Sequence, residues 1–413
     1  MPRIVVGLSG GVDSAFAATL LQERGFDVVG CYLKVAVDGA PCPWKEDLPM
    51  AHRVAAHLNI PLVVKDVSAS FEHEVLEPMV AAYQSGETPN PDILCNRWVK
   101  FDALIAVARE VGAERIATGH YARVVRNAPN PVVIASEAKP SAAIPSNTVP
   151  GLLRRVAPRN DAGEIELHRG LDYAKDQSYF LATLTQEQFR VAEFPLGEWR
   201  KEDVRAEAKR RGLPNWDRES TSGVCFLGHL NLANFLSLRG RSRSNLGHSS
   251  STPATVITTT GEVLGTVPNA EALTIGQRIP IGGQSAPRYV VANSPTLSVG
   301  EPRRIVVSAT PDDPARLVSV VHATDPHWIG SVSPLASGRG SVRGSFRCSA
   351  RIRHRQEPQP CSVSLRGAAR GSNPGLEVRF DASLTGVAPG QAIVFSDGDR
   401  ILGSATIDRR RTS

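Results

Sequence analysis

The first 120 residues alternate between short apolar runs and longer segments in which apolar side chains recur every three or four positions. The runs predict buried strands and the longer segments predict helices. The strands predicted in this way are residues 4–8, 26–35, 60–67 and 114–120, and the helices are residues 12–24, 45–58, 71–84 and 98–111. Strands that are almost wholly apolar and alternate with helices are typical of a doubly wound α/β domain with a parallel sheet covered on both faces.

The pattern changes twice further along the chain. Residues 127–163 are rich in Pro, Ala and Ser and have no sustained period, which predicts a disordered surface insertion. From about residue 231 onward, short β-branched runs are separated by Gly, Pro and Asp turns, as in all-β structure. We therefore predict three domains: an α/β domain over 1–224, a small mixed or β domain over 225–300, and a C-terminal β-barrel or sandwich over 301–413.

Composition adds limits to this picture. The chain has 413 residues, of which 41% are hydrophobic and 21% are charged, as in a soluble globular protein. No run of about 18 apolar residues occurs, so no membrane span is expected. The first residues resemble a buried strand and not a signal peptide, so we expect a cytoplasmic protein whose six cysteines are mostly thiols. A net charge of +6 is only weak support for a nucleic-acid partner.

The segment "SGGVDS", Ser9 to Ser14, lies between the first predicted strand and the first predicted helix. Two glycines, two hydroxyls and a helix N-terminus together favour an anion-binding loop for a pyrophosphate group. The segment lacks the G-K-[ST] of a Walker loop, and a plain tight Gly turn is the alternative interpretation. Asp13 is the oxygen ligand in this loop that could hold a phosphate-bound Mg²⁺.

Two cysteines occur in polar segments that we interpret as loops. Cys95 closes "TPNPDILC" and Cys225 lies in "STSGVCFLG", 130 positions later (225 − 95). Thiol–disulfide exchange needs two thiols within reach, but a buried filler role for either cysteine remains open from the residues alone. Cys31, Cys348 and Cys361 lie among strand residues, where filler is the better interpretation, and no C-x₂-C pair points to zinc.

Several longer motifs then narrow the choice. In order, they are "SGGVDS", "GETPNPDILCNRWVKF", "ATGHYAR", "LHRGLDYAKDQSYFLATL", "STSGVCFLG", "LTIGQR", "RCSARIRHRQEPQPCSV" and "VAPGQAIVFSDGDRILG". Together they closely resemble the bacterial tRNA-specific 2-thiouridylase family, within the adenine-nucleotide α-hydrolase class of pyrophosphate-loop enzymes. The resemblance covers both ends and most of the middle of the chain, fails over 127–163 and is loose between about 240 and 330.

This resemblance implies ATP- and Mg²⁺-dependent 2-thiolation of the wobble uridine of tRNA. The C2 oxygen would be adenylated and then replaced by sulfur from a persulfide on Cys225. Cys95 would be the partner thiol and would form a transient disulfide with Cys225. Asp92 matches a third catalytic position and could act as acid or base.

The resemblance also implies binding residues and partners. The matching ATP-binding positions are Gly7, Leu8, Ser9, Gly10, Gly11, Val12, Asp13, Ser14, Leu33 and Gly119. The matching tRNA contacts are Asn90, Pro91, Asp92, His120, Lys175, Asp176, Gln177, Arg353, His354 and Gln391. The implied partners are the anticodon stem-loops of tRNAs for Lys, Glu and Gln, and a persulfide donor such as a cysteine desulfurase or a sulfur relay protein.

The arginines of "RCSARIRHR" alternate at positions 351, 353 and 355. On a strand they would share one face, which suits phosphate binding, although a solvated edge strand has the same pattern. Two other hypotheses for the whole chain remain: a pyrophosphate-loop ligase that uses an amine, and a tRNA-binding protein that has lost catalysis. The intact "SGGVDS", Cys95 and Cys225 argue against both.

Overall fold

The structure is a computed structural model of the chain, and its description covers a defined set of residues. These are residues 1–38, 40, 42–126, 165–219, 225–228, 232, 235–236, 253–268, 270–282, 286–294, 303–311, 313–330, 335, 345–366 and 375–408. The predicted insertion over 127–163 therefore lies outside the described residues. Within them, no helix is long and apolar enough to cross a membrane.

The first domain is built on a five-stranded sheet, and every pairing in it is parallel. In spatial order its strands are β3 (Leu62–Asp66), β2 (Asp27–Lys34), β1 (Arg3–Gly7), β4 (Arg115–Ala117) and β7 (Ala192–Glu193). From β1 the chain goes outward through β2 and β3, and it then returns to place β4 on the other side of β1. The order of the strands thus reverses between β1 and β4, and ligands bind at this position in folds of this kind.

Both faces of this sheet are covered, as the apolar strands predict. Ile4 and Val6 of β1 pack on one side with the helices α1 (Val12–Glu23), α2 (Trp44–Leu58) and α9 (Lys201–Arg210). Val5 faces the other side and packs in a cluster that includes two long helical segments. Alternate residues of a strand point to opposite faces, so one apolar strand supplies two cores.

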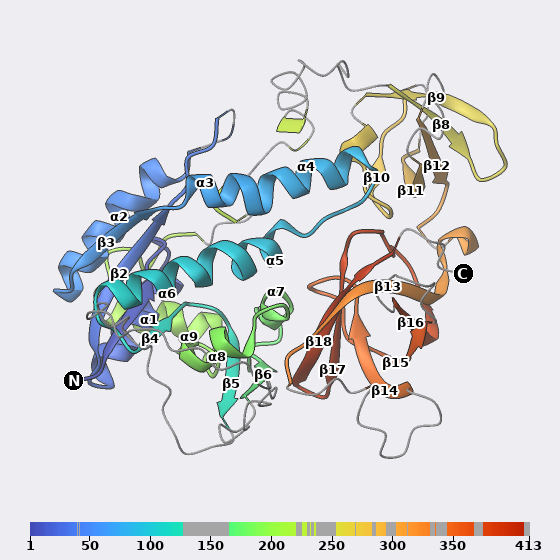
Figure 1. Cartoon of the computed structure of the whole chain (residues 1–413). Coiled ribbons are helices and arrows are strands. Elements are labelled where there is room, and N and C mark those ends of the chain that lie inside the picture. The colour runs from blue at the N-terminus through green and yellow to red at the C-terminus, as the bar shows by residue number, and fades with distance from the viewer. Residues whose placement is uncertain are drawn as a thin grey trace, which may run out of the picture.

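The two long helical segments each contain a π-helical turn. The first comprises α3 (Ser68–Phe71), the π-turn η1 (Glu72–Leu76) and α4 (Glu77–Gln84), and the second comprises α5 (Pro91–Cys95), the π-turn η2 (Asn96–Lys100) and α6 (Phe101–Glu110). The two segments run side by side, and η1 contacts both α5 and η2. In Figure 1 they extend from the sheet toward the remaining domains.

The loop predicted around Cys95 is wrong, because α5 begins at Pro91 and includes Cys95. The Asn90 side chain accepts a hydrogen bond of 3.3 Å from the Ile93 amide and so caps the helix. Proline at the first helical position supplies the backbone angle that a helix needs there. The sequence "NPDI" is therefore a helix start, and the predicted helix extends further toward the N-terminus than residue 98.

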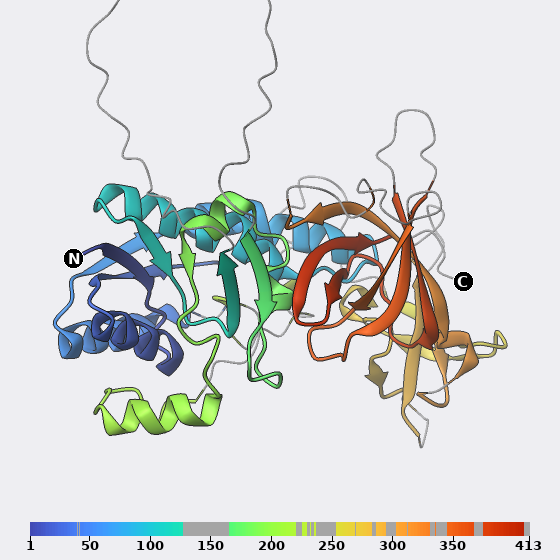
Figure 2. The same cartoon turned by 90° about the horizontal axis from the view of Figure 1, so that it is seen from below.

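The remaining short elements of the first domain connect it to the barrel. They are the helices α7 (Ser178–Leu181) and α8 (Gln186–Val191) and the hairpin β5 (Ala122–Arg126) with β6 (Ile165–Arg169). The hairpin pairs through β6 with a barrel strand, so one sheet continues from the first domain into the C-terminal part of the chain. Figure 2 shows this hairpin between the two domains.

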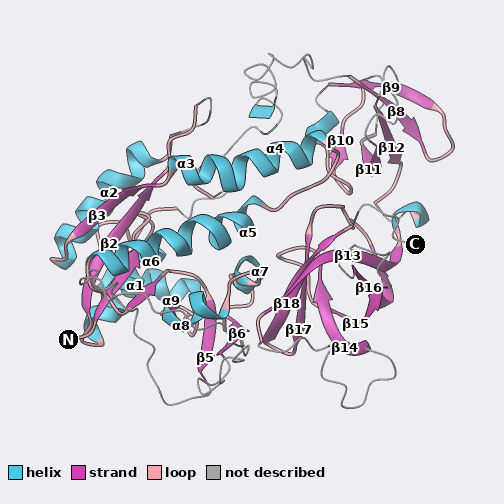
Figure 3. Cartoon of the chain, in the orientation of Figure 1, coloured by secondary structure: helices cyan, strands magenta, loops and turns pink. Residues whose placement is uncertain are grey.

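The later part of the chain is mostly β-structure, as predicted (Figure 3). The central domain is a sheet in the order β10 (Arg278–Ile279), β11 (Arg288–Ser294), β12 (Arg304–Ser308), β8 (Ala254–Thr258) and β9 (Val263–Val267), with the short 3₁₀ helix η3 (Ala270–Ala272). The C-terminal domain follows the 3₁₀ helix η4 (Pro314–Arg316). Its strands are β13 (Val318–Trp328), β14 (Ser345–Arg351), β15 (Gln359–Arg366), β16 (Gly375–Leu384), β17 (Ala392–Asp397) and β18 (Arg400–Ile407).

These six strands form a closed barrel. Their order is β13-β16-β15-β14-β17-β18, and β13 also pairs with β18, which joins the two ends of the sheet. Closure removes the free strand edges that would otherwise be open to other chains. Apolar side chains fill the interior, among them Val363, Val378 and Phe395.

The three alternating arginines do not lie on one strand, because β14 ends at Arg351, so the condition for a shared face is not met. Arg351 is 3% exposed and its Nη2 lies 2.9 Å from Asp176 Oδ2, in the first domain. Arg353 donates to the carbonyls of Gly386 (3.0 Å) and Ile275 (3.2 Å), which links the barrel to the central domain. Of the three, Arg355 is the exposed one.

Asp176 is the centre of a buried polar network between the first domain and the barrel. Its carboxylate accepts hydrogen bonds from the Gly170 amide (3.1 Å), the Ser178 amide (3.1 Å) and the Ser178 hydroxyl (2.9 Å), besides the pair with Arg351. A buried carboxylate with this many donors holds its partners in fixed positions. The orientation of the barrel against the first domain therefore depends on Asp176.

Replacing Asp176 with alanine is expected to destabilise the protein by about 3–5 kcal/mol, because Arg351 is left buried without its counter-charge. Urea unfolding followed by circular dichroism measures the change. Glu202→Ala, which removes an exposed partner 4.0 Å from Arg200, is the control and should leave the midpoint unchanged. Equal midpoints for Asp176→Ala and the wild type would contradict this role.

Candidate functional site

The loop after β1 forms the first half of the site. The Ser9 amide donates to Ser14 Oγ (3.1 Å), and the Ser14 hydroxyl donates to the Gly11 carbonyl (2.9 Å). Gly10 has φ +79, a left-handed conformation that glycine adopts without strain. Gly11 caps α1, so the amides of the first helical turn open onto the loop. These features are those of an anion-binding turn.

Other segments hold this loop in place. The Gly10 carbonyl accepts hydrogen bonds from Asn215 Nδ2 (2.9 Å) and Arg218 Nη1 (3.1 Å). Arg218 also pairs with Asp47 at the start of α2. After β4, the backbone of Gly119 passes so close that a Cβ there would lie 2.9 Å from the Ser14 amide nitrogen. Gly119 thus belongs beside the loop, at the reversal point between β1 and β4.

Asp13, in the first turn of α1, is held by two groups that the sequence does not bring near it. The Tyr121 hydroxyl donates to its Oδ1 at 2.8 Å, and Lys201 Nζ lies 2.5 Å from the same atom. Burial of Lys201 lowers the pKa of its ammonium, and the charge of Asp13 opposes this effect. One carboxylate and one ammonium therefore lie together at the loop.

Leu33, expected from the sequence as an ATP-binding residue, lies on β2, is 7% exposed and packs in the core cluster of the long helices.

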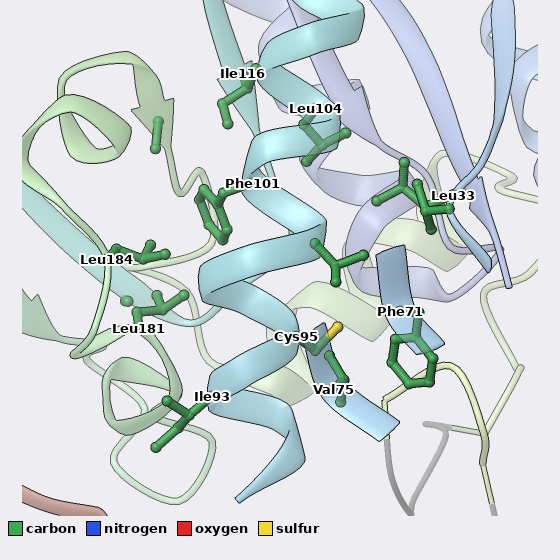
Figure 4. Close-up of a cluster of buried hydrophobic side chains, with 14 of the residues drawn as sticks. Leu33, Phe71, Val75, Ile93, Cys95, Phe101, Leu104, Ile116, Leu181 and Leu184 are labelled. Atoms are coloured by element: carbon green, nitrogen blue, oxygen red, sulfur yellow. The ribbon is translucent and has the colours of Figure 1, made fainter. Parts of the chain in front are cut away.

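The second half of the site is a pair of sulfur atoms. Cys95 Sγ lies 3.5 Å from Cys225 Sγ, and the Cys225 amide donates to Asp92 Oδ1 at 2.9 Å. Asp92 and Cys95 lie three positions apart on α5 and so share a face of the helix. The structure thus brings together all three catalytic residues expected from the sequence. Figure 4 shows Cys95 among buried side chains that include Phe71 and Val75.

The two thiols of this pair differ in their acidity. Burial, and then the hydrogen bond to Cys225, raise the pKa of Cys95 well above its usual value. The hydrogen bond from Cys95 and the charge of Lys100 lower the pKa of Cys225 to about 7, although burial opposes them. Cys225 is therefore the more acidic thiol of the pair, and Cys95 is the less acidic one. Burial also raises the pKa of Asp92, and the Cys225 amide counteracts this.

The turn that carries Cys225 has unusual backbone geometry. Phe226 has φ +64, which is rare for a bulky residue. This conformation costs energy and persists only where the surrounding structure holds it. Its ring packs edge-on against Phe71, with centroids 5.7 Å apart. The strained turn is thus anchored in the core of the long helices, directly next to the reactive sulfur.

The residues just before α5 are held by both other domains. The Thr88 amide donates to the Pro389 carbonyl (2.7 Å), and the Thr88 carbonyl accepts a hydrogen bond from Gln391 Nε2 (3.0 Å). The Thr88 hydroxyl lies 3.5 Å from that of Thr274 in the central domain. Gln391 was expected from the sequence to contact tRNA. In the structure its side chain donates to the Thr88 carbonyl, just before α5.

The other expected tRNA contacts differ in exposure. Lys175 is exposed, whereas Asp176 is buried in the network described above and Gln177 Oε1 accepts from the Tyr121 amide at 3.0 Å. His354 Nε2 lies 2.7 Å from the Asp176 carbonyl.

His120 is 8% exposed and stacks near Phe101, with centroids 6.1 Å apart. Burial, with the charge of Lys100, holds the pKa of His120 well below its usual value. His120 is therefore neutral.

The remaining cysteines behave as the sequence indicates. Cys31 is buried on β2, and burial raises its pKa to about 12. Cys348 and Cys361 face each other across β14 and β15 with sulfurs 3.6 Å apart. The hydrogen bond to Cys361, and then burial, raise the pKa of Cys348.

Sequence reasoning missed Lys100, Lys201 and Arg218. Lys100 lies five positions after Cys95, a spacing that a regular α-helix would not bring to one face, and the π-turn over Asn96–Lys100 was not predicted. Lys201 and Arg218 lie far along the chain from the Ser9–Ser14 loop, and only the folded structure brings them into contact with it.

Comparison with known proteins gives consistent results across the chain. The profile of the tRNA methyl transferase HUP domain matches residues 2–229, and that of the aminomethyltransferase β-barrel domain matches residues 318–407. The tRNA-specific 2-thiouridylase MnmA of Bacillus subtilis is 32% identical over 411 residues, which cover 98% of this chain and 95% of that protein. MnmA of Methylococcus capsulatus is 34% identical over 416 residues, which cover 98% and 96%. A crystal structure of a 4-thiouridine synthetase–RNA complex with bound ATP is 15% identical, covers 55% of this chain and 45% of that chain, and has a TM-score of 0.31.

Mild oxidation with diamide is expected to link Cys95 to Cys225, because their sulfurs need only close from 3.5 Å to about 2.05 Å. Asp92→Ala should slow this link about fivefold, since the Cys225 amide loses an acceptor that contributes about 1 kcal/mol. Asp92→Asn removes the same charge but keeps an oxygen acceptor, and so it is the matched control. Peptide mapping under non-reducing conditions measures the product. If Cys225 links mainly to another cysteine, the observed pairing is not the one in solution.

Proposed function

Because the chain belongs to the tRNA-specific 2-thiouridylase family, we propose that it replaces the C2 oxygen of the wobble uridine of tRNA with sulfur, at the expense of ATP. The observation that carries this proposal is the contact of 3.5 Å between Cys95 and Cys225, one sulfur acidic and the other not. A sulfur-transfer reaction needs a thiolate that can accept sulfur and a second thiol that can release it. An amine-using ligase has no need for this pair.

ATP would bind at the loop over Ser9–Ser14, at the reversal point of the sheet. Asp13 is the carboxylate there that would hold Mg²⁺, and carboxylate oxygen is the ligand type this ion prefers. Among the described residues no cluster of three acidic, His or Cys side chains occurs, so phosphate and water oxygens would complete the coordination shell. The ion would offset the charge of the phosphates, while Lys201 balances Asp13.

The proposed reaction has three steps. The uridine C2 oxygen attacks the α-phosphate of ATP, and pyrophosphate leaves. Cys95 then attacks the inner sulfur of the Cys225 persulfide, and a Cys95–Cys225 bond forms. The outer sulfur departs as sulfide and takes up the proton of the Cys95 thiol. This sulfide bonds to C2, and AMP leaves. The disulfide that remains must be reopened by an external thiol, which is oxidised in turn.

The proposed partners are the anticodon stem-loop of tRNAs for Lys, Glu and Gln, and a protein persulfide donor such as a cysteine desulfurase or sulfur relay protein. The segment Asn90–Asp92 would meet the base, since it lies at the start of the helix that carries Cys95. Lys175 is exposed next to the buried Asp176 and would contact a tRNA phosphate.

The enzyme, supplied with ATP, Mg²⁺, a persulfide donor, a thiol reductant and unmodified tRNA, is expected to form 2-thiouridine, measured by nucleoside mass spectrometry. Cys225→Ser should abolish the product and keep tRNA binding. Cys348→Ser, which changes a thiol that also contacts another cysteine, should retain activity. If the wild type binds tRNA and makes no thiouridine, the chain is a binding protein without this activity.

Lys175→Ala is expected to weaken tRNA binding and to reduce the slope of log affinity against log salt by about 1, because one phosphate contact is lost. Filter binding over a salt series measures the slope. Lys65→Ala removes a charge from the far edge strand β3, where Lys65 pairs with Glu110 at 2.8 Å, and should leave the slope unchanged. A slope for Lys175→Ala equal to that of the wild type would show that tRNA binds elsewhere.

A further inference from the structure

Lys100 is a cation that the helical segment places beside the two sulfurs. It is the last residue of the π-turn η2, which follows directly after Cys95. In a π-type turn the backbone hydrogen bond spans five residues instead of four, so the turn is wider than in an α-helix. In a regular α-helix five residues rotate the side chain by about 140° from the starting direction. The widened turn therefore brings Lys100 nearer to the side of the segment that carries Cys95.

The contacts of Lys100 point to the turn that carries Cys225. Its Nζ lies 6.0 Å from the centre of the ring of Phe226, the residue next to Cys225, and its positive charge lowers the pKa of Cys225. Although burial disfavours its charge, the neighbouring Cys225, Cys95 and Asp92 raise the pKa of Lys100. An ammonium in this position remains charged at neutral pH.

We propose that Lys100 holds the sulfur of Cys225 in its anionic form for sulfur uptake, and that the π-turn η2 is the device that brings its ammonium to this sulfur. The inference rests on the proposed sulfur transfer and deepens it. The Cys225 thiolate attacks the outer sulfur of the donor persulfide, and a bond forms between these two atoms. The sulfur–sulfur bond of the donor breaks, and the donor leaves as a thiolate that takes up a proton from water.

The other charged and titratable groups around Cys225 do not replace Lys100. Asp92, on α5, raises the pKa of Cys225, and the Cys95 thiol supplies a hydrogen bond but no positive charge. His120 faces Lys100 from the loop after β4 and is neutral, because burial lowers its pKa. His354, from the barrel, acts on Asp92, and burial lowers its pKa as well.

The pair Cys348 and Cys361 gives an internal comparison. Its sulfurs lie 3.6 Å apart, almost as close as those of the catalytic pair. The cation that acts on Cys348 is the exposed Arg347, which is engaged by Asp381 in a bidentate pair. The pKa of Cys348 is raised, first by the hydrogen bond to Cys361 and then by burial. Contact between two sulfurs is therefore not enough for an acidic thiol.

The rate of alkylation of Cys225 by iodoacetamide, followed by peptide mass spectrometry over a range of pH, tests this role in the full chain without tRNA or ATP. A lowered thiol pKa makes the thiolate abundant above that pKa and scarce below it. The wild-type rate should therefore be half-maximal near pH 7. Lys100→Met should shift the profile upward by about one pH unit and lower the rate at pH 7 about fivefold.

Two further variants make the outcome specific. Lys100→Arg keeps the charge and should return the profile most of the way to that of the wild type. Lys65→Met, on β3, removes a charge elsewhere and should leave the profile unchanged. Overlapping profiles for Lys100→Met and the wild type, with both proteins folded by circular dichroism, would overturn the proposal. Because no tRNA is present, this result is independent of whether the wild type makes thiouridine.

Discussion

The contact between Cys95 and Cys225 joins the turn that follows the first domain to the two long helical segments. The two residues lie 130 positions apart, and their sulfurs meet at 3.5 Å. The Cys225 amide donates to Asp92, Phe226 packs edge-on against Phe71, and the ammonium of Lys100 lies 6.0 Å from the Phe226 ring. Because these partners all belong to the two long helical segments, those helices fix the chemistry as well as cover the sheet.

The same helices connect this pair to the other domains and to the loop after β1. Thr88, just before α5, is bound by Gln391 of the barrel and lies beside Thr274 of the central domain. At the other end, α6 packs on β1 and β4, whose following loops contain Ser9–Ser14 and Gly119. A shift of the barrel relative to the first domain would therefore also move the start of the helix that carries Asp92.

Much of the first domain follows from local pattern, because apolar strands and periodic helices are set by nearby residues. Val12–Glu23 and Trp44–Leu58 agree with the predicted helices to within one residue. The start of α5 was misread because the proline of "NPDI" was taken as a loop signal, although Asn-Pro is also a capping pattern. The arginines after residue 351 were misread because period two cannot reveal where a strand ends. The contacts of Asp176, Lys201 and Arg218 join distant segments, and no local pattern contains them. Asp92, Cys95 and Cys225 were proposed as catalytic residues through long motifs, and their mutual distances came only from the fold.

The central claim is that the two sulfurs act as one unit in a single sulfur transfer. The most direct test is a single turnover with the persulfide preloaded on the enzyme, ATP and tRNA present, and no reductant. Thiouridine and the Cys95–Cys225 disulfide are then quantified in the same samples. One disulfide is expected for each thiouridine formed, with both appearing at the same rate. Thiouridine that accumulates while both thiols stay free would contradict it.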